Sequence, residues 1–197
     1  MDINIEIEDK LYEANVCRKE QEYDLAVKKY IELYQILKKN KQWYQQYGCE
    51  VLKQLCFCYR KKKNIKAAID SINEAIRLTS KNSLKYECNQ TARSNLAICY
   101  MNKGVIYDEM GIFDTAIENY NMGVSIFREL VTHNGTQMNL LINALLNLGT
   151  AYFNNKEYDI SKRTFYELLD FLGNNREVDS RGMYAMDYIK KIEGEKA

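Results

Sequence analysis

The side chains that could carry catalysis are few in this chain. The only histidine is His133, which stands beside Asn134–Gly135 in a predicted turn, with no orienting partner that the sequence identifies. Cysteine–histidine catalysis needs a thiol and an imidazole in contact. The sequence has no phosphate-binding glycine loop, no nucleophile elbow and no zinc-protease motif. We therefore expect a protein that is not an enzyme and binds no cofactor; an enzyme using His133 and a cysteine is the catalytic alternative.

The six cysteines lie inside helical patterns rather than in short loops. This placement favours reduced thiols that pack as small hydrophobic side chains. Cys56 and Cys58 are two residues apart, and side chains at that spacing on a helix point in different directions, so the pair does not chelate one ion. We expect no metal site. The six residues are Cys17, Cys49, Cys56, Cys58, Cys88 and Cys99.

The composition is that of a globular protein built mostly of helix. The chain has 197 residues, of which 46% are hydrophobic, and this length suits one domain or one continuous repeat array. Proline is absent, and because proline breaks helix interiors we expect an all-α fold. The 28 Lys and Arg residues balance 27 Asp and Glu residues, which removes the electrostatic basis for a nucleic-acid or anionic-membrane binder. The acidic start, Met1–Glu8, and the lack of a run of roughly 20 apolar residues favour a cytoplasmic protein.

A pattern of small and large residues repeats four times. The copies begin at the small residues Ala14, Cys56, Gly104 and Gly149, which are separated by 42, 48 and 45 positions. The clearest copy consists of Gly104, Tyr107, Phe113, Ala116, Tyr120 and Gly123. The first two of these residues lie on one face of a first helix, and the last three lie on one face of a second helix. Small residues let the two helices approach closely, and the large residues fill the space beside them.

Each helical hairpin leaves an apolar face that only the next hairpin can bury, so the pattern predicts a stacked right-handed solenoid. Few loop residues are available, and the long separations must therefore lengthen the helices. We expect the first helix of the third repeat to run from about Ser83 to Met110. Turns between repeats are expected at Asn40, Ser80–Ser83, Asn134–Gly135 and Gly173–Asn174.

These residues resemble tetratricopeptide repeats over about residues 6–172. The stretch 102–117 is close to the family consensus, whereas the first copy departs from it at Cys17 and Leu33. The resemblance implies an all-α right-handed α-solenoid that forms a single domain over residues 1–197. Its four repeats are expected at about 6–39, 44–80, 83–132 and 136–172, with a capping helix at about 177–193 whose apolar flank is Met183, Met186, Ile189 and Ile192. The long repeats resemble those of kinesin light chains and of the peptide-sensing domains of Gram-positive bacterial regulators.

The resemblance also implies that the first helix of each pair lines a concave groove. Gln54, Asn102 and Asn147 recur there at one equivalent position, and a carboxamide can pair with both the N–H and the C=O of an extended peptide. Phe57 and Val105 would form side-chain pockets. The alternative is that these amides are simply exposed on helices. The predicted ligand-binding residues are Asn15, Gln54, Phe57, Arg60, Asn102, Val105, Asn143, Asn147 and Thr150.

The run Arg60-Lys61-Lys62-Lys63 is open to two interpretations. It falls at the C-terminal end of a predicted helix, where cations complement the helix dipole. Alternatively it contacts an anionic group of the ligand, because Arg18 and Lys19 occupy the equivalent positions one repeat earlier.

We thus expect a cytoplasmic interaction module that binds a short peptide or an extended protein segment in its groove and has a regulatory role. The expected partner is a peptide or protein, with no nucleic acid and no membrane. The alternative is a structural adaptor or homo-oligomeric scaffold, such as a homodimer, that uses its convex or terminal surface. This alternative predicts an exposed apolar patch around Met183–Ile192.

Overall fold

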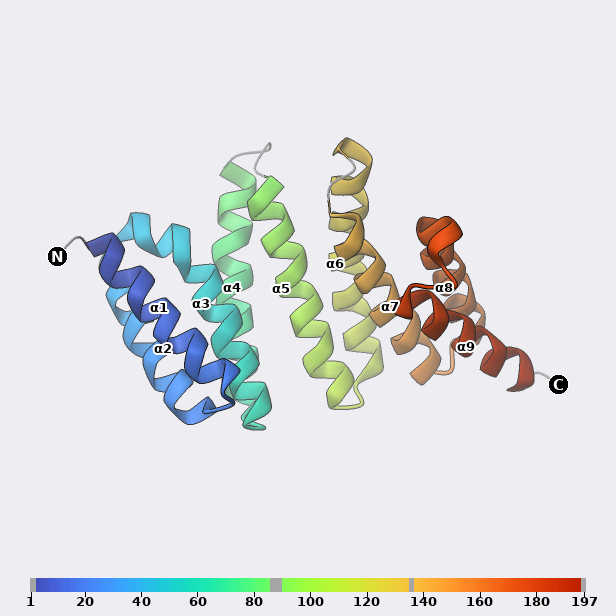
Figure 1. Cartoon of the computed structure of the whole chain (residues 1–197), viewed down its shortest axis with the longest axis horizontal. Coiled ribbons are helices and arrows are strands. Elements are labelled where there is room, and N and C mark those ends of the chain that lie inside the picture. Colours follow the sequence, from blue (N-terminus) through green and yellow to red (C-terminus); the bar gives the residue numbers. More distant parts are fainter. Residues whose placement is uncertain (1–2, 86–89, 135–136, 196–197) are drawn as a thin grey trace. The chain divides into compact units, whose positions relative to one another are not determined.

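The computed structural model describes residues 3–85, 90–134 and 137–195, and every regular element within them is a helix (Figure 1). The helices are α1 (Ile3–Lys19), α2 (Tyr23–Lys38), α3 (Lys41–Lys61), α4 (Ile65–Lys85), α5 (Gln90–Glu109), α6 (Phe113–Asn134), α7 (Met138–Asn154), α8 (Tyr158–Leu172) and α9 (Ser180–Glu195). A short 3₁₀ helix, η1 (Gly173–Asn175), follows α8. In the described ranges no helix is long and apolar enough to cross a membrane.

The chain forms two compact units, Met1–Asn102 and Lys103–Ala197, and the division falls inside α5. In the first unit α2 contacts α1 and α3, and α3 also contacts α4 (Figure 1). In the second unit α7 contacts α6 and α8, and α9 contacts both α8 and α7. The predicted all-α series of helical hairpins with a final capping helix is confirmed.

The turn inside each repeat has one shared backbone conformation. A residue with positive φ lies two positions after the end of the first helix of each pair; these residues are Gln21 (63°), Lys63 (58°), Gly111 (73°) and Lys156 (63°). The next amide donates to the carbonyl five residues back, as Glu22 N does to Cys17 O at 2.9 Å. This arrangement satisfies carbonyls that the helix end would leave without partners. The positive-φ residues have the same spacing as the small residues that begin the repeats, so the predicted register is confirmed.

Two glycines of the second unit face aromatic rings across a helix pair. A Cβ added at Gly104 would lie 2.5 Å from the ring of Tyr120, and one added at Gly149 would lie 2.6 Å from the ring of Phe165. Both rings are almost completely buried. Only glycine therefore allows these rings to lie directly against the backbone of the facing helix. The buried hydroxyl of Ser161 donates to the Gly149 carbonyl at 2.8 Å and joins the same pair of helices.

The boundary between α4 and α5 differs from the prediction. α4 continues through the predicted turn at Ser80–Ser83 and ends at Lys85, so the expected helix from Ser83 to Met110 is wrong. Thr79 shows the physical reason, because its buried hydroxyl donates to the carbonyl of Ala75 at 2.8 Å. A hydroxyl satisfied inside the helix does not compete with the helical backbone.

Other predicted turns lie where helices begin or end. The side chain of Asn40 accepts from the backbone N–H groups of Gln42 and Trp43 and so caps the N-terminus of α3. Gly173 has a φ of 52° and ends α8. In the predicted turn at Asn134–Gly135, the asparagine is the last residue of α6 and the glycine lies outside the described residues.

The buried face of α9 is rotated from the predicted one. Gly182, Ala185, Ile189 and Ile192 are buried, whereas Met183, predicted on one apolar flank with Ile189 and Ile192, is 49% exposed, so that flank is not buried along its whole length. A Cβ at Gly182 would lie 2.1 Å from the carbonyl oxygen of Arg176. This close backbone approach turns the glycine inward and leaves the next residue facing outward.

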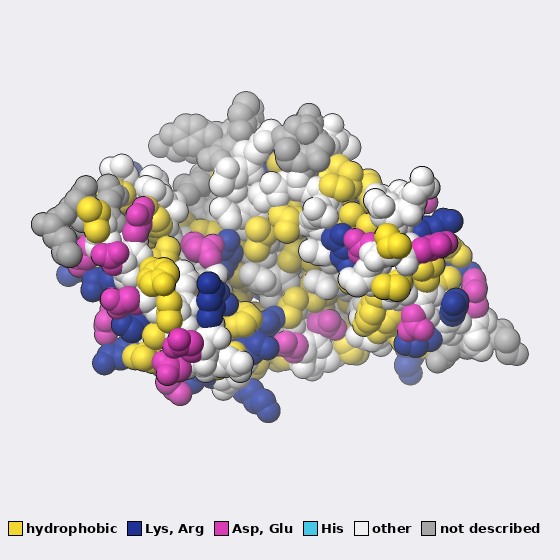
Figure 2. All heavy atoms as spheres, viewed as in Figure 1, with side chains coloured by type: hydrophobic (Ala, Val, Ile, Leu, Met, Phe, Trp, Pro, Cys, Tyr) yellow, Lys and Arg dark blue, Asp and Glu magenta, His cyan; other side chains and the backbone are white. Residues whose placement is uncertain are grey.

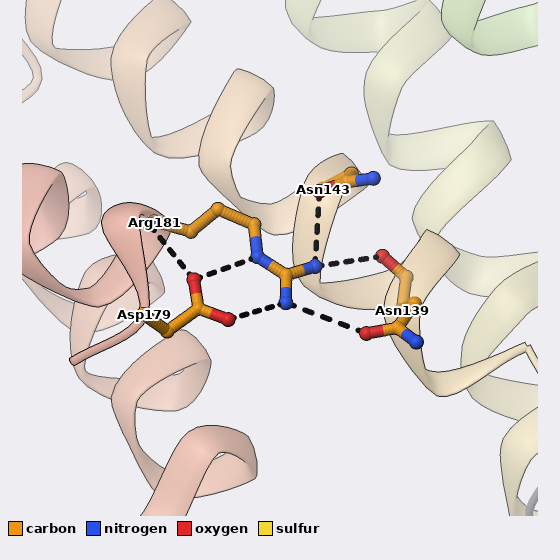
Figure 3. A network of polar contacts seen from close by, with 4 residues as sticks. All are labelled: Asn139, Asn143, Asp179 and Arg181. Atoms are coloured by element: carbon orange, nitrogen blue, oxygen red, sulfur yellow. Dashed lines mark hydrogen bonds and ion pairs between the residues drawn. The ribbon is translucent and has the colours of Figure 1, made fainter. Parts of the chain in front are cut away.

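Arg181 attaches the start of α9 to α7 (Figure 3). Its guanidinium donates to both carboxylate oxygens of Asp179, at 2.9 and 2.6 Å. It also donates to Oδ1 of Asn143 at 3.1 Å and to Oδ1 of Asn139 at 3.3 Å. Hydrogen bonds from the Arg181 side chain and backbone lower the pKa of Asp179 to about 2.

Replacing Gly149 by alanine should destabilise the protein. The added methyl must displace the Phe165 ring, and overpacking of this kind costs about 1–3 kcal/mol. Gly194→Ala is the matched control, because a Cβ there meets nothing within 4 Å and alanine favours helix. Thermal unfolding of both variants measures the difference. A Gly149→Ala variant as stable as Gly194→Ala would contradict the packing described above.

The Asp179 carboxylate should stabilise the protein in a pH-dependent way. Its folded pKa lies below the unfolded value of about 3.9, so its contribution is present above that value and is lost as the pH falls toward 2. Asp179→Asn should therefore lower the melting temperature at pH 6 and flatten its dependence between pH 4 and 2. Asp170→Asn, on the exposed side of α8, should leave that dependence unchanged. Identical pH profiles for wild type and Asp179→Asn would contradict the ion pair.

Candidate functional site

A pocket of about 270 Å³ opens in the first unit. The first helices of three successive repeats supply its wall, which places side chains of α1, α3 and α5 around one space. Arg18 comes from α1, Lys53, Gln54, Cys56, Phe57 and Arg60 come from α3, and Ile98 and Asn102 come from α5. We call this space the Arg18–Arg60 pocket. It contains four of the predicted ligand-binding residues, namely Gln54, Phe57, Arg60 and Asn102.

Three cationic groups surround the ring of Phe57. The guanidinium carbons of Arg18 and Arg60 lie 5.5 and 5.6 Å from the ring centroid, and Nζ of Lys61 lies 5.6 Å from it. Tyr23 packs edge-on against the same ring, with the two centroids 6.3 Å apart. Elsewhere on α1 and α2 basic and acidic side chains are interspersed, as Figure 2 shows for one face. The gathering of cations at Phe57 is therefore a local feature.

Arg18 lies where α1 faces the pocket, and its Nε is buried with no hydrogen-bond partner among the described residues. Its charge acts on the buried Tyr30 of α2. Burial raises the pKa of Tyr30 to about 12, and the hydrogen bond and charge of Arg18 oppose that rise. The neutral Tyr30 hydroxyl donates to Oδ1 of Asn15 at 2.7 Å. Asn15, a predicted ligand-binding residue, thus joins α1 to α2.

Glu50 forms a cluster with Lys53 and Gln54, two residues of α3 that line the pocket. Lys53 Nζ lies 2.8 Å from one carboxylate oxygen, and Gln54 Nε2 donates to the other at 2.6 Å. Burial raises the pKa of Glu50, but these contacts and the charges of Lys53 and Arg18 lower it further than burial raises it. Glu50 is therefore ionised, and it neutralises Lys53. Lys53 also donates to Oδ1 of Asn95 on α5 at 3.1 Å.

The remaining predicted site residues lie in the second unit. Asn143 is exposed on α7, and its carbonyl oxygen accepts from Arg181. The Thr150 hydroxyl donates to the carbonyl of Leu146 within α7 at 2.9 Å. Val105 and Asn147 are half-buried. Two of these four side chains thus already take part in internal hydrogen bonds.

Sequence reasoning did not include Lys53 among the site residues. A signal was present, because Lys53, Phe57 and Arg60 are spaced four and three apart and so share one face of a helix. The sequence predicts that Arg18 joins the groove at the position equivalent to Arg60, one repeat earlier, and both side chains line the pocket. The place of Arg18 in the pocket depends on the packing of α1 beside α3, which the spacing does not specify.

The predicted burial of the cysteines is confirmed for the five that the structure describes. Cys17, Cys49, Cys56, Cys58 and Cys99 are all buried. Burial raises the pKa of Cys58 to about 11, which keeps it a thiol. Within the described ranges no group of three or more His, Cys, Asp or Glu side chains is placed to hold a metal ion. The side chains of His133 and Cys88 lie outside the described part, so the catalytic alternative stays a prediction.

No protein-family model and no curated protein matches this sequence. Solved structures match at low identity. The apo form of RapI has a TM-score of 0.77 at 13% identity over 95% of this chain, which spans 48% of the length of RapI. BtubC from P. vanneervenii has a TM-score of 0.73 at 17% identity, and the match covers 95% of this chain and 76% of BtubC. The TPR-like repeats of a putative kinesin light chain from Podosopora anserina have a TM-score of 0.71 at 12% identity, and the match covers 98% of this chain and 87% of the kinesin chain. The chain therefore has the fold of a tetratricopeptide-repeat solenoid, as its sequence predicts.

Proposed function

We propose that the protein is a non-catalytic interaction module that binds an extended peptide or protein segment in the Arg18–Arg60 pocket. One observation carries the proposal. Gln54, Phe57, Arg60 and Asn102 were selected from the repeat register together with the family resemblance, and they line a single pocket. The fold shared with tetratricopeptide-repeat proteins supports an interaction role.

The chemistry of the wall suits a peptide. The carboxamide of Asn102 offers a donor and an acceptor for one peptide unit. Phe57 and Ile98 supply apolar surface beside it. At about 270 Å³ the pocket is smaller than the roughly 300–1,000 Å³ of cofactor and drug-like sites, and it suits one or two side chains of a longer segment. We propose that Asn147, at the equivalent position of the fourth repeat, makes a similar contact within the second unit.

Removing the Asn102 carboxamide should weaken peptide binding. A neutral hydrogen bond is worth about 0.5–1.5 kcal/mol, so Asn102→Ala should raise the mean Kd for a pool of blocked random hexapeptides roughly 2- to 12-fold. Equilibrium dialysis with mass-spectrometric detection measures this change. Asn73→Ala is the matched control, because Asn73 is exposed on α4, a second helix of its pair. Equal Kd values for the two variants would contradict a role for Asn102.

The adaptor alternative rests on a different surface. Met183 and Tyr184 of α9 are 49% and 45% exposed, and they lie in the segment where that alternative expects an apolar patch. If they join two copies, Met183→Ser should shift the sedimentation coefficient from dimer to monomer at micromolar concentration. A wild type that sediments as a monomer would end the homodimer alternative. A regulatory role and a cytoplasmic location stay predictions from the sequence.

A further inference from the structure

Two cysteine side chains from different helices meet in the first unit. Cys49 of α3 and Cys99 of α5 are 50 positions apart in the sequence, and their sulfur atoms lie 3.9 Å apart. Both side chains are buried, Cys49 at 7% exposure and Cys99 at 0%. A disulfide bond holds its sulfur atoms at about 2.05 Å, so this pair needs to close by about 1.9 Å, which rotation about the Cα–Cβ bonds can supply. The two thiols are thus placed to be joined.

A second pocket of the first unit, of about 260 Å³, leads to Cys49. Three of its lining residues, Gln45, Gln46 and Thr91, are exposed, so the pocket opens to solvent. We call this space the Cys49 pocket. Its other lining residues are Glu50, Thr79, Ala92 and Asn95. Because carboxamides and hydroxyls make up most of this wall, the pocket suits a small polar reactant.

The contacts of the pair favour the thiolate of Cys49 over that of Cys99. The hydrogen bond from the Cys99 thiol lowers the pKa of Cys49, and the charge of Lys53, four residues further along α3, acts in the same direction. Burial and the Glu50 carboxylate oppose them with a smaller effect. The hydrogen bond with Cys49, together with burial, raises the pKa of Cys99. Cys49 is therefore the nucleophile of the pair, because the thiolate is the reactive form of cysteine.

We infer that Cys49 and Cys99 form a redox-active dithiol, and that a hydroperoxide entering the Cys49 pocket converts it into a disulfide between α3 and α5. The inference goes beyond the proposed function, because it requires no bound peptide. Since Cys49 is only 7% exposed, a small oxidant reaches it and the disulfide of another protein does not. The new bond would join two helices that also line the Arg18–Arg60 pocket.

The reaction has two balanced steps. In the first, the Cys49 thiolate attacks one oxygen of the hydroperoxide; an S–O bond forms, the O–O bond breaks, and the leaving hydroxide or alkoxide takes up the proton that the thiol lost. In the second, the Cys99 sulfur attacks the sulfur of the Cys49 sulfenic acid; an S–S bond forms, the S–O bond breaks, and the leaving hydroxide takes the Cys99 proton. Two thiols and one hydrogen peroxide thus become one disulfide and two waters.

The test uses hydrogen peroxide as the oxidant and peptide mapping as the readout. The fully reduced protein is treated with peroxide at neutral pH, its remaining thiols are blocked with N-ethylmaleimide, and it is digested with trypsin without reductant. Trypsin places the two cysteines in separate peptides, residues 42–53 and 94–103, which contain no other cysteine. The expected product is these two peptides joined with the loss of two hydrogen atoms, and dithiothreitol should separate them.

The wild-type map alone can overturn the inference. A cross-link that joins a different pair of cysteines would do so. Oxidation of Cys49 to the sulfinic or sulfonic acid without a cross-link would do so as well, because it would show that Cys99 does not resolve the sulfenic acid. Unchanged thiols at both positions after treatment would show that peroxide does not reach the pair.

Single variants assign the two roles. In Cys99→Ala the resolving thiol is removed, so dimedone should trap a sulfenic acid at Cys49. In Cys49→Ala dimedone should label Cys99 at least about tenfold less, because that sulfur is fully enclosed. Stronger labelling of Cys99 than of Cys49 would overturn the assignment of the nucleophile.

Cys58→Ala is the matched control. Cys58 lies on the same helix and is fully buried, and burial raises its pKa to about 11, so it stays a thiol. This variant should form the cross-link to the same extent as the wild type. Loss of the cross-link in Cys58→Ala equal to that in Cys49→Ala would overturn the pairing. Thermal melting confirms that each variant is folded, and the wild-type map decides the inference where one is not.

Discussion

The close approach of two helices at a small residue is the constraint on which the rest of the structure depends. Gly104 and Gly149 have no Cβ, and the rings of Tyr120 and Phe165 occupy the space directly over them. Such a contact fixes the rotation of the first helix about its own axis. Once the rotation is fixed, the residues two before, one after and four after the small residue share one flank of the helix. In the second repeat those residues are Gln54, Phe57 and Arg60, and they meet at one pocket.

The helices of this chain end without proline. The turn inside each repeat closes through a positive-φ residue and a hydrogen bond to the carbonyl five residues back. Asn40 begins α3 by capping its free N–H groups, and Gly173 ends α8. At Thr79 the hydroxyl is satisfied inside α4, and the helix runs on past the predicted turn. The positions of helix ends thus follow from hydrogen bonding as much as from residue type.

The repeat spacing was sufficient to predict the helical hairpins and, with the family resemblance, four of the pocket residues of α3 and α5, namely Gln54, Phe57, Arg60 and Asn102. It predicts these because both follow from helical periodicity and from the position of the small residue. It did not predict the internal partners of Asn15 and Asn143. Asn15 meets Tyr30 from the adjacent helix, and Asn143 meets Arg181 from a helix whose buried face differs from the predicted one. Such contacts depend on which long side chain of one helix reaches a neighbouring helix, and the repeat spacing does not predict this.

The intra-repeat turns carry a consequence for the order of folding. Gln21, Lys63 and Lys156 adopt a left-handed conformation that costs an L-residue about 1–2 kcal/mol, whereas Gly111 adopts it freely. The turn between α5 and α6 therefore forms at the lowest conformational free-energy cost. The turns of the other three hairpins depend on contacts with helices that have already folded. We expect nucleation at this central hairpin and growth outward from it, with the earliest amide protection in pulsed hydrogen exchange at α5 and α6. Earliest amide protection in the terminal helices would show that side-chain packing determines the order of folding, and not the backbone cost of the turns.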